Sequence, residues 1–188
     1  GIAQARRFNT DERAIRVSIN VSARDLDDAD LPRRVAELLA LNGVAPEHIA
    51  LEVTESAIMG KPDAAINVLR RLADQGIELA IDDFGVGQSS FAYLRKLPVR
   101  ELKIDKTFID HLTEARADQT IVRTIVELGH NLGYRVTAEG VDDIRVLDYL
   151  AGIGCDHAQG YLIAKALPNA AFDDFLASDA ATRWATTP

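Results

Sequence analysis

The chain alternates short apolar runs, rich in β-branched residues, with longer segments of helical periodicity, and it does so six times in succession. The predicted strands cover residues 15–22, 48–56, 77–83, 99–105, 134–140 and 155–164. The predicted helices that follow them cover residues 30–43, 62–76, 89–98, 118–133, 142–154 and 169–184. Parallel strands need a crossover connection, and a helix after each strand supplies it. The pattern therefore predicts an α/β fold built on a parallel sheet.

Two architectures fit this succession of units. The strands are nearly continuous apolar runs, as expected when helices cover the sheet. Part of a (β/α) barrel and an open, doubly wound sheet both satisfy that pattern, and six strands cannot close the usual eight-stranded barrel. No repeat, linker or low-complexity tract divides the 188 residues, 47% of which are hydrophobic, so we predict a single domain over residues 1–188.

Composition excludes several classes of function. The formal net charge is −8, which disfavours DNA or RNA as a partner because nucleic-acid binding relies on basic surface. The sequence has no apolar run long enough to span a bilayer, and its start lacks the apolar core of a signal peptide. The single cysteine, Cys155, fits a reducing compartment. We expect a cytoplasmic domain, which is compatible with a parent chain anchored in a membrane elsewhere.

Every predicted strand ends in a polar or charged residue. In chain order these are Asn20, Glu52 with Glu55, Asp82 with Asp83, Lys103 with Asp105, Glu139, and Gln159. Because the carboxyl ends of parallel strands meet at one edge, we expect these side chains to form one rim. Carboxylate and amide oxygens select Mg²⁺, Mn²⁺ or Ca²⁺, and no cluster of histidine or cysteine competes for the role.

Two positions in this rim have alternative interpretations. Asp82 and Asp83 are either a solvated strand end or the ligands of a cationic site in which Asp82 bridges two metal ions. Lys103 either forms a structural ion pair with Asp105 or holds a water and steadies developing charge among the carboxylates.

Five segments follow one another in the order and spacing of a known family. They are "INVSARDL", "LEVTES", "IDDFGVGQSSFAYLRKLPVRELKIDKTFI", "VTAEGVD" and "GCDHAQGYLIAKALP". Over nearly its whole length the sequence resembles the EAL-domain cyclic di-GMP phosphodiesterases. That family folds as a modified TIM barrel whose first strand runs antiparallel to the others. The resemblance implies a TIM-like (β/α) barrel, with the last six strand–helix units present in this chain.

The resemblance also implies a reaction and a set of ligands. Family members hydrolyse cyclic di-GMP to linear pGpG with two Mg²⁺ or Mn²⁺ ions. By this likeness Asn20, Glu52 and Asp82 would hold one ion, and Asp82, Asp83 and Glu139 the other.

Four further roles are implied by the same likeness. Lys103 and Gln159 would act on the attacking water, and Asp142 and Gln159 would contact the substrate. Glu55 would anchor the loop at 84–90, which couples the site to a homodimer in the family.

The chief departure from the family is an absent segment. The Glu-Ala-Leu motif, which supplies another metal-binding glutamate, does not occur, so we expect the first two strands to be missing and the barrel to be open. This polypeptide alone should then turn over substrate weakly or not at all. A catalytically impaired module that binds cyclic di-GMP or a protein is one alternative, and a Mg²⁺-dependent lyase with Lys103 as base is another. An upstream diguanylate cyclase-like or sensor domain is expected from the family.

Overall fold

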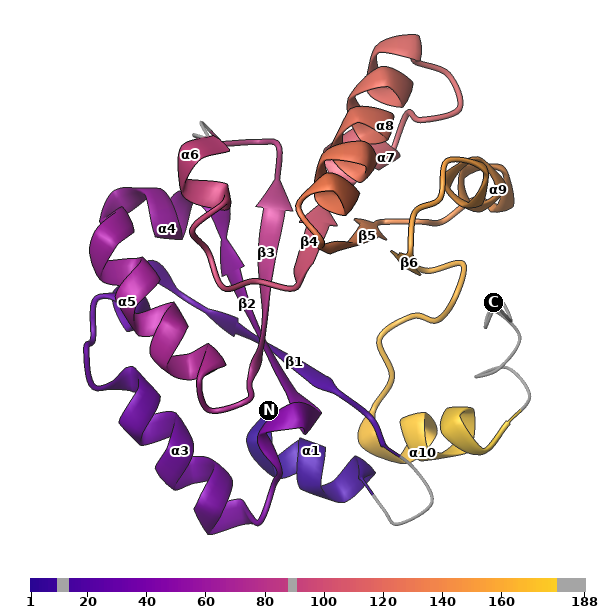
Figure 1. Cartoon of the computed structure of the whole chain (residues 1–188). Helices are drawn as coiled ribbons and strands as arrows, with labels where there is room; N and C mark the ends of the chain where they lie inside the picture. Colours follow the sequence, from indigo (N-terminus) through magenta and orange to yellow (C-terminus); the bar gives the residue numbers. More distant parts are fainter. Residues whose placement is uncertain (10–13, 88–90, 179–188) are drawn as a thin grey trace.

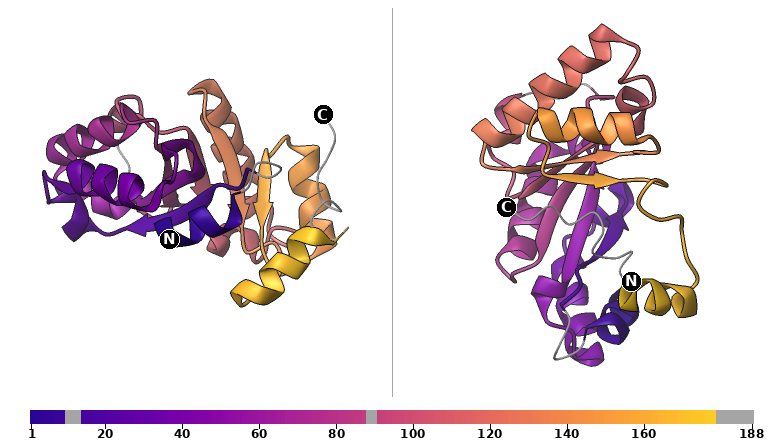
Figure 2. Two further views of the ribbon diagram at one scale, coloured as in Figure 1. Left: turned by 90° about the horizontal axis from the view of Figure 1, so that it is seen from below. Right: turned by 90° about the vertical axis from the view of Figure 1, so that its right-hand side faces the viewer.

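Pairing of each strand with the next one in the chain organises the fold. The computed structural model describes residues 1–9, 14–87 and 91–178. Its six strands form one sheet in the order β1 to β6, and every neighbouring pair is parallel. The strands are β1 (Val17–Val21), β2 (Ile49–Thr54), β3 (Glu78–Phe84), β4 (Glu101–Ile104), β5 (Arg135–Glu139) and β6 (His157–Gln159). The strands curl into part of a barrel, as Figures 1 and 2 show.

Helices connect the strands and cover the sheet (Figure 1). They are α1 (Ile2–Phe8), α2 (Ala23–Leu26), α3 (Leu31–Asn42), α4 (Glu55–Gly60), α5 (Pro62–Ala73), α6 (Phe91–Leu94), α7 (Lys106–Ile109), α8 (Arg116–Asn131), α9 (Ile144–Gly152) and α10 (Asn169–Ala177), with a 3-10 turn η1 (Pro46–His48). No helix within the described ranges is long and apolar enough to cross a membrane.

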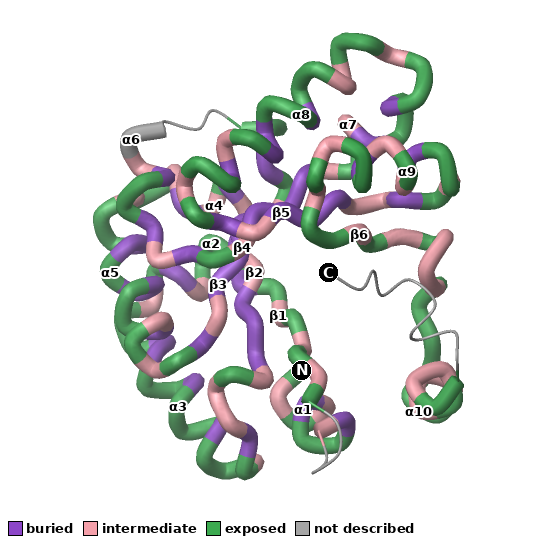
Figure 3. Tube along the Cα trace, turned by 45° about the vertical axis from the view of Figure 1, so that its right-hand side comes forward, coloured by how far each residue is buried: buried purple, intermediate pink, exposed green. Residues whose placement is uncertain are grey.

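Alternation along the strands separates an apolar face from a polar one. Leu79 and Ile81 of β3 and Leu102 and Ile104 of β4 are at most 1% exposed, and they belong to the core cluster with the helices. Residues between them point to the opposite face of the sheet, because side chains alternate along a strand. The tube in Figure 3 shows this burial concentrated in the central strands.

Polar residues at the carboxyl ends of the strands also start the short helices of the rim. Ser22 and Asp25 form a reciprocal capping box at α2. Thr54 accepts a hydrogen bond from the Ala57 amide at the start of α4, and Asp105 accepts one from Thr107 at the start of α7. These caps fix the direction in which the chain leaves β1, β2 and β4.

Strands β1 and β6 are the two edges of the sheet, and in the described part of the chain they do not pair with each other. The expected open barrel of six strand–helix units is therefore confirmed. Strand β6 covers only His157–Gln159 of the ten residues predicted, and its side chains are half-buried or exposed because one of its edges has no neighbouring strand.

The segment after β6 leads to α10, which packs beside α1 (Figures 1 and 2). The rings of Phe8 and Phe172 meet edge to face with centroids 4.9 Å apart, and Arg7 forms an ion pair of 2.5 Å with Asp173. Figures 1 and 2 show α10 beside α1, although 166 residues separate Arg7 from Asp173. The contact joins the first helix to the last helix that the structure describes.

The structure differs from the sequence-based expectation on one face of α3. The helical spacing within residues 30–43 predicts Val35, Leu38 and Leu39 on one face. Val35 and Leu39 are buried in α3, but Leu38 is 46% exposed. The apolar stripe of α3 is thus narrower than the run of leucines indicates. Residues 89–90 and 179–184 of two predicted helices lie outside the described residues.

Two helical glycines should respond oppositely to alanine. A Cβ at Gly129 would lie 2.4 Å from Cγ2 of Val136, whereas a Cβ at Gly152 meets nothing within 4 Å. Alanine normally favours a helix over glycine, so Gly152→Ala should raise the free energy of unfolding by up to about 1 kcal/mol. Gly129→Ala should lower it by about 1–3 kcal/mol because the core is already filled. Urea denaturation of both variants measures this, and equal shifts would contradict it.

Candidate metal and active site

Strand register brings the predicted side chains to one edge of the sheet. Asn20 lies opposite Glu52 in the pairing of β1 with β2, and Thr54 lies opposite Asp82 in the pairing of β2 with β3. Glu139 lies opposite Gln159 in the pairing of β5 with β6. The rim predicted from the strand ends is therefore present, and its members come from all six strands.

The ammonium group of Lys103 lies at the centre of this rim. Its Nζ is 2.6 Å from Glu139 Oε1, 2.8 Å from Glu52 Oε2 and 3.3 Å from Asp82 Oδ1. The Lys103 side chain is only 5% exposed. The first alternative, an ion pair of Lys103 with Asp105, is therefore wrong, because Lys103 contacts three other carboxylates, one each from β2, β3 and β5.

Burial and charge act against each other at Lys103. Removal from water lowers the pKa of a lysine, but hydrogen bonds to Glu139 and Glu52 and their negative charges outweigh that effect. The pKa of Lys103 is therefore raised, and the side chain is a permanent cation. Burial raises the pKa of Glu139, which the Lys103 ammonium opposes and the charges of Asp82 and Glu52 reinforce.

Asp82, Asp83 and Glu139 form a group that could hold a metal ion. Each offers a carboxylate oxygen, and these oxygens lie within 4.8 Å of one another. Asp83 reaches the group because its backbone has a φ of +52°, a left-handed conformation that aspartate tolerates better than most residues. This turn overcomes the alternation that would send adjacent aspartates to opposite faces.

One oxygen of this group, Asp82 Oδ1, lacks a hydrogen bond in the part of the chain that the structure describes. It is buried and accepts no hydrogen bond within the described residues, although it lies at ion-pair distance from Lys103. A carboxylate oxygen buried without a hydrogen bond is costly, so Asp82 Oδ1 is suited to bind a cation in addition to its ion pair with Lys103.

The acidic neighbours of Asp83 change the pKa of its carboxyl group. Burial raises its pKa, and the charge of Asp82 and the nearby carboxyl group of Asp105 raise it further. Asp105 itself is held charged by the hydroxyl and amide of Thr107, which lower its pKa against the effect of burial. Asp105 is thus a neighbour of Asp83 and lies outside the group of Asp82, Asp83 and Glu139.

Glu55 links the rim to the loop that follows Asp83. It is 3% exposed, and its Oε2 accepts a hydrogen bond of 3.2 Å from the Gly85 amide. A Cβ at Gly87 would lie 2.5 Å from Glu55 Oε1, so the loop passes close over this carboxylate. The predicted anchoring contact is present as far as Gly87, and residues 88–90 of the loop lie outside the described part.

Two predicted substrate contacts lie at the outer side of the rim. Gln159 at the end of β6 is exposed. Asp142 is exposed, and its Oδ1 accepts a hydrogen bond of 2.7 Å from the Tyr161 amide. That bond connects the loop after β5 to the loop after β6, so Asp142 orients this side of the rim.

A cavity of about 590 Å³ opens beside the acidic residues. Asn20, Glu52, Asp82 and Asp83 line it, together with residues of α2 and α4. Its volume falls within the range typical of small-molecule sites, about 300–1,000 Å³.

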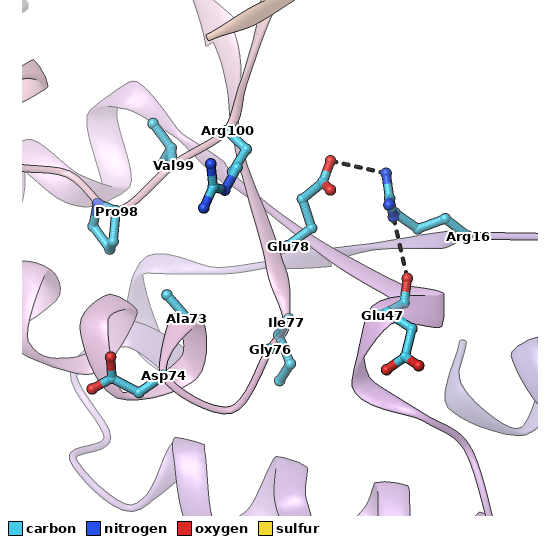
Figure 4. A pocket seen from close by; sticks show the side chains of 10 residues that line it. All are labelled: Arg16, Glu47, Ala73, Asp74, Gly76, Ile77, Glu78, Pro98, Val99 and Arg100. Atoms are coloured by element: carbon cyan, nitrogen blue, oxygen red, sulfur yellow. Dashed lines mark hydrogen bonds and ion pairs between the residues drawn. The ribbon is translucent and has the colours of Figure 1, made fainter. Parts of the chain in front are cut away.

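A second hollow, of about 460 Å³, lies at the opposite end of the strands (Figure 4). Arg16 bridges Glu78, at 3.0 Å, and the carbonyl oxygen of Glu47, at 3.3 Å. Arg135 also pairs with Glu78, and Arg100 lines the same hollow. At this end of the strands the Glu78 carboxylate has two cationic partners. At the rim, in contrast, three carboxylates surround one ammonium group.

A family model described as EAL domain matches residues 1–166. The chain belongs to the EAL domain family. Fold comparison agrees, because the chain superimposes on the EAL domain of Mycobacterium smegmatis DcpA with a TM-score of 0.87 and 32% identity, covering 94% of this chain and 80% of that one. The sequence-based recognition and the TIM-like barrel are both confirmed.

Two other relatives of this EAL domain carry functional names. The cyclic di-GMP phosphodiesterase NbdA of Pseudomonas aeruginosa is 41% identical over 162 residues, which are 86% of this chain and 21% of NbdA. A structure named as the PaMucR phosphodiesterase in complex with c-di-GMP has a TM-score of 0.81 and 38% identity, covering 84% of this chain and 64% of that one. The chain spans about a fifth of the length of NbdA.

The contact between Glu55 and the loop can be tested by mutational coupling. Gly87→Ala should lower the free energy of unfolding by about 1–3 kcal/mol, because its methyl group displaces the buried Glu55 carboxylate. In a Glu55→Ala background the same change should cost clearly less, because the clash is gone. Gly60→Ala, where a Cβ meets nothing within 4 Å, is the control. Additive costs of Gly87→Ala and Glu55→Ala would show that the two residues do not interact.

Proposed function

We propose that this EAL domain is the catalytic part of a metal-dependent phosphodiesterase that hydrolyses cyclic di-GMP to linear pGpG. The observation that carries the proposal is the cluster of Asp82, Asp83 and Glu139, whose oxygens lie within 4.8 Å of one another beside an open cavity. The naming of NbdA as a cyclic di-GMP phosphodiesterase and the c-di-GMP complex of PaMucR support the choice of substrate.

The residues present fit divalent metal ions. The donor set is made of carboxylate and amide oxygens, which suit Mg²⁺ and Mn²⁺, and the buried Asp82 Oδ1 lacks a hydrogen-bond donor among the described residues. We assign Asn20, Glu52 and Asp82 to one ion and Asp82, Asp83 and Glu139 to a second. Two such ions, when bound, neutralise phosphate charge and make water a stronger nucleophile.

The chain's own residues contribute positioning and charge. We assign Lys103, at the centre of the rim, and Gln159, on its β6 side, to orient the attacking water. Attack of that water breaks one P–O3′ bond, and the freed 3′ oxygen takes up a proton. Glu55 holds the loop after Asp83 against the site through the Gly85 amide.

The cavity next to the rim offers a place for one half of the dinucleotide. It extends from the acidic residues toward Ser22, Thr54 and Ser56, whose hydroxyl groups can contact sugar and base. Asp142 sits at the other side of the rim and is assigned to the substrate's second half together with Gln159.

The proposal extends to dimer formation, neighbouring domains and cellular location. Val86, in the loop after Asp83, is 60% exposed, which suits a contact with a second copy. NbdA is about five times as long as the segment that it shares with this chain, which leaves room for a diguanylate cyclase-like or sensor domain. We place the domain in the cytoplasm, where such second messengers act.

Substitution of Asp82 tests the site directly. In the protein that contains this chain, Asp82→Asn should reduce cyclic di-GMP cleavage at least about 100-fold, because Asp82 is assigned to both ions. Chromatographic detection of pGpG with Mg²⁺ or Mn²⁺ present measures this. Asp148→Asn is the control, because it removes the same charge at an exposed position on α9, and it should leave the rate unchanged. Intact cyclic di-GMP after incubation with the unmodified protein and either metal would refute the proposal.

A further inference from the structure

Lys103 contacts the same carboxylate side chains that the proposed function assigns as metal ligands. Its ammonium group contacts Glu52, Asp82 and Glu139, one from each of three strands, at 2.6–3.3 Å. All three belong to the proposed ligand set. A divalent cation bound by these carboxylates would therefore lie close to a buried positive charge.

The competition follows from charge and space. Two like charges a few ångströms apart repel strongly where water is scarce, and Lys103 is only 5% exposed. A carboxylate oxygen that accepts a hydrogen bond from Lys103 also has fewer lone pairs available for a metal ion. Metal entry must then move the ammonium group or weaken its hydrogen bonds.

No other cation in the described ranges compensates these carboxylates at ion-pair distance. The arginines on the same side of the sheet, Arg16 and Arg135, lie at the opposite end of the strands and pair with Glu78. Lys106, the residue after Asp105, is exposed and forms no ion pair within the described residues. The metal-free site thus depends on Lys103 for its charge balance.

We propose that Lys103 is a built-in counter-cation that stabilises the metal-free domain and sets its affinity for divalent metal ions. This inference rests on the proposed function for the assignment of the ligands, but it concerns an equilibrium that needs no substrate. With metal ions bound, Lys103 would be displaced from these carboxylates or would bind them more weakly, and its ammonium group would then be available to orient a water. The domain therefore remains folded without metal at the cost of weaker metal binding.

The first test is a metal titration without substrate. Lys103→Met keeps most of the side-chain volume and removes the charge, so calorimetric titration with Mn²⁺ and with Mg²⁺ at pH 8 should show at least about tenfold tighter binding than in the unmodified protein. The melting temperature of the metal-free variant should fall, because three carboxylates lose their counter-cation. Saturating Mn²⁺ should restore it to within a few degrees.

A control variant measures how the loss of one positive charge elsewhere in the domain changes metal affinity. Lys61→Met deletes one exposed ammonium group, which pairs with Asp27 at 2.9 Å and forms no ion pair with Glu52, Asp82 or Glu139. Its metal affinity should stay within about twofold of the unmodified protein, since exposed charges are screened. An equal gain in both variants would overturn the specific role of Lys103.

The outcomes separate this inference from the proposed function. Unchanged or weaker metal binding by Lys103→Met would overturn the inference, even if the unmodified protein cleaves cyclic di-GMP. If the Lys103→Met variant binds metal and the unmodified protein does not, the result would support the inference and contradict metal use by the unmodified protein. Absence of binding in both would contradict both.

A second measurement uses the unmodified protein and covers the case in which Lys103→Met does not fold. A buried, hydrogen-bonded ammonium group exchanges its protons slowly enough to be observed by nitrogen-15 NMR. Addition of Mg²⁺ should shift or broaden the Lys103 signal, while the exposed Lys61 signal or its methylene carbons stay in place. A Lys103 signal that does not respond at metal saturation would overturn the inference.

Discussion

Parallel pairing of successive strands is the constraint on which the rest of this structure depends. Because β1 to β6 pair in chain order, all six carboxyl ends lie at one edge, and alternation turns the polar residues of that edge away from the helices. The apolar residues on the other face, such as Leu79 and Leu102, are fully buried and hold the strands in register. The rim is rigid because the core beneath it is packed, and this gives an acidic cluster the fixed geometry that metal binding requires.

Charge balance inside the rim connects stability with function. Three carboxylates and one ammonium group leave a negative excess that is expensive to bury unless cations arrive. An unbalanced charge of this kind is common at functional sites, where side chains are arranged to bind a ligand and not to maximise the stability of the free protein. The opposite end of the same strands, where Glu78 is shared by Arg16 and Arg135, shows the alternative of matched pairs.

Much of the fold could be predicted from periodicity, and part of the site from strand ends. The six strands, their parallel pairing and the rim residues follow from apolar runs that end in polar side chains. The partners of Lys103 could not be predicted, since Asp105 is closer in sequence while Glu52 and Glu139 reach it only through the sheet. The exposed Leu38 was misplaced because a run of leucines does not specify how wide a buried stripe is. The left-handed turn at Asp83 also depends on tertiary structure, because aspartate does not require it.

The contact between α1 and α10 has a consequence for the order of folding. Each strand of the sheet pairs with the next one in the chain, so the sheet can grow by closing short loops one after another. The meeting of Phe8 with Phe172 instead closes a loop of more than 160 residues, as the separation of Arg7 from Asp173 shows. Its entropic cost is repaid only when the strands between are already in place. We therefore expect this pair of helices to dock last during folding and to separate first during unfolding.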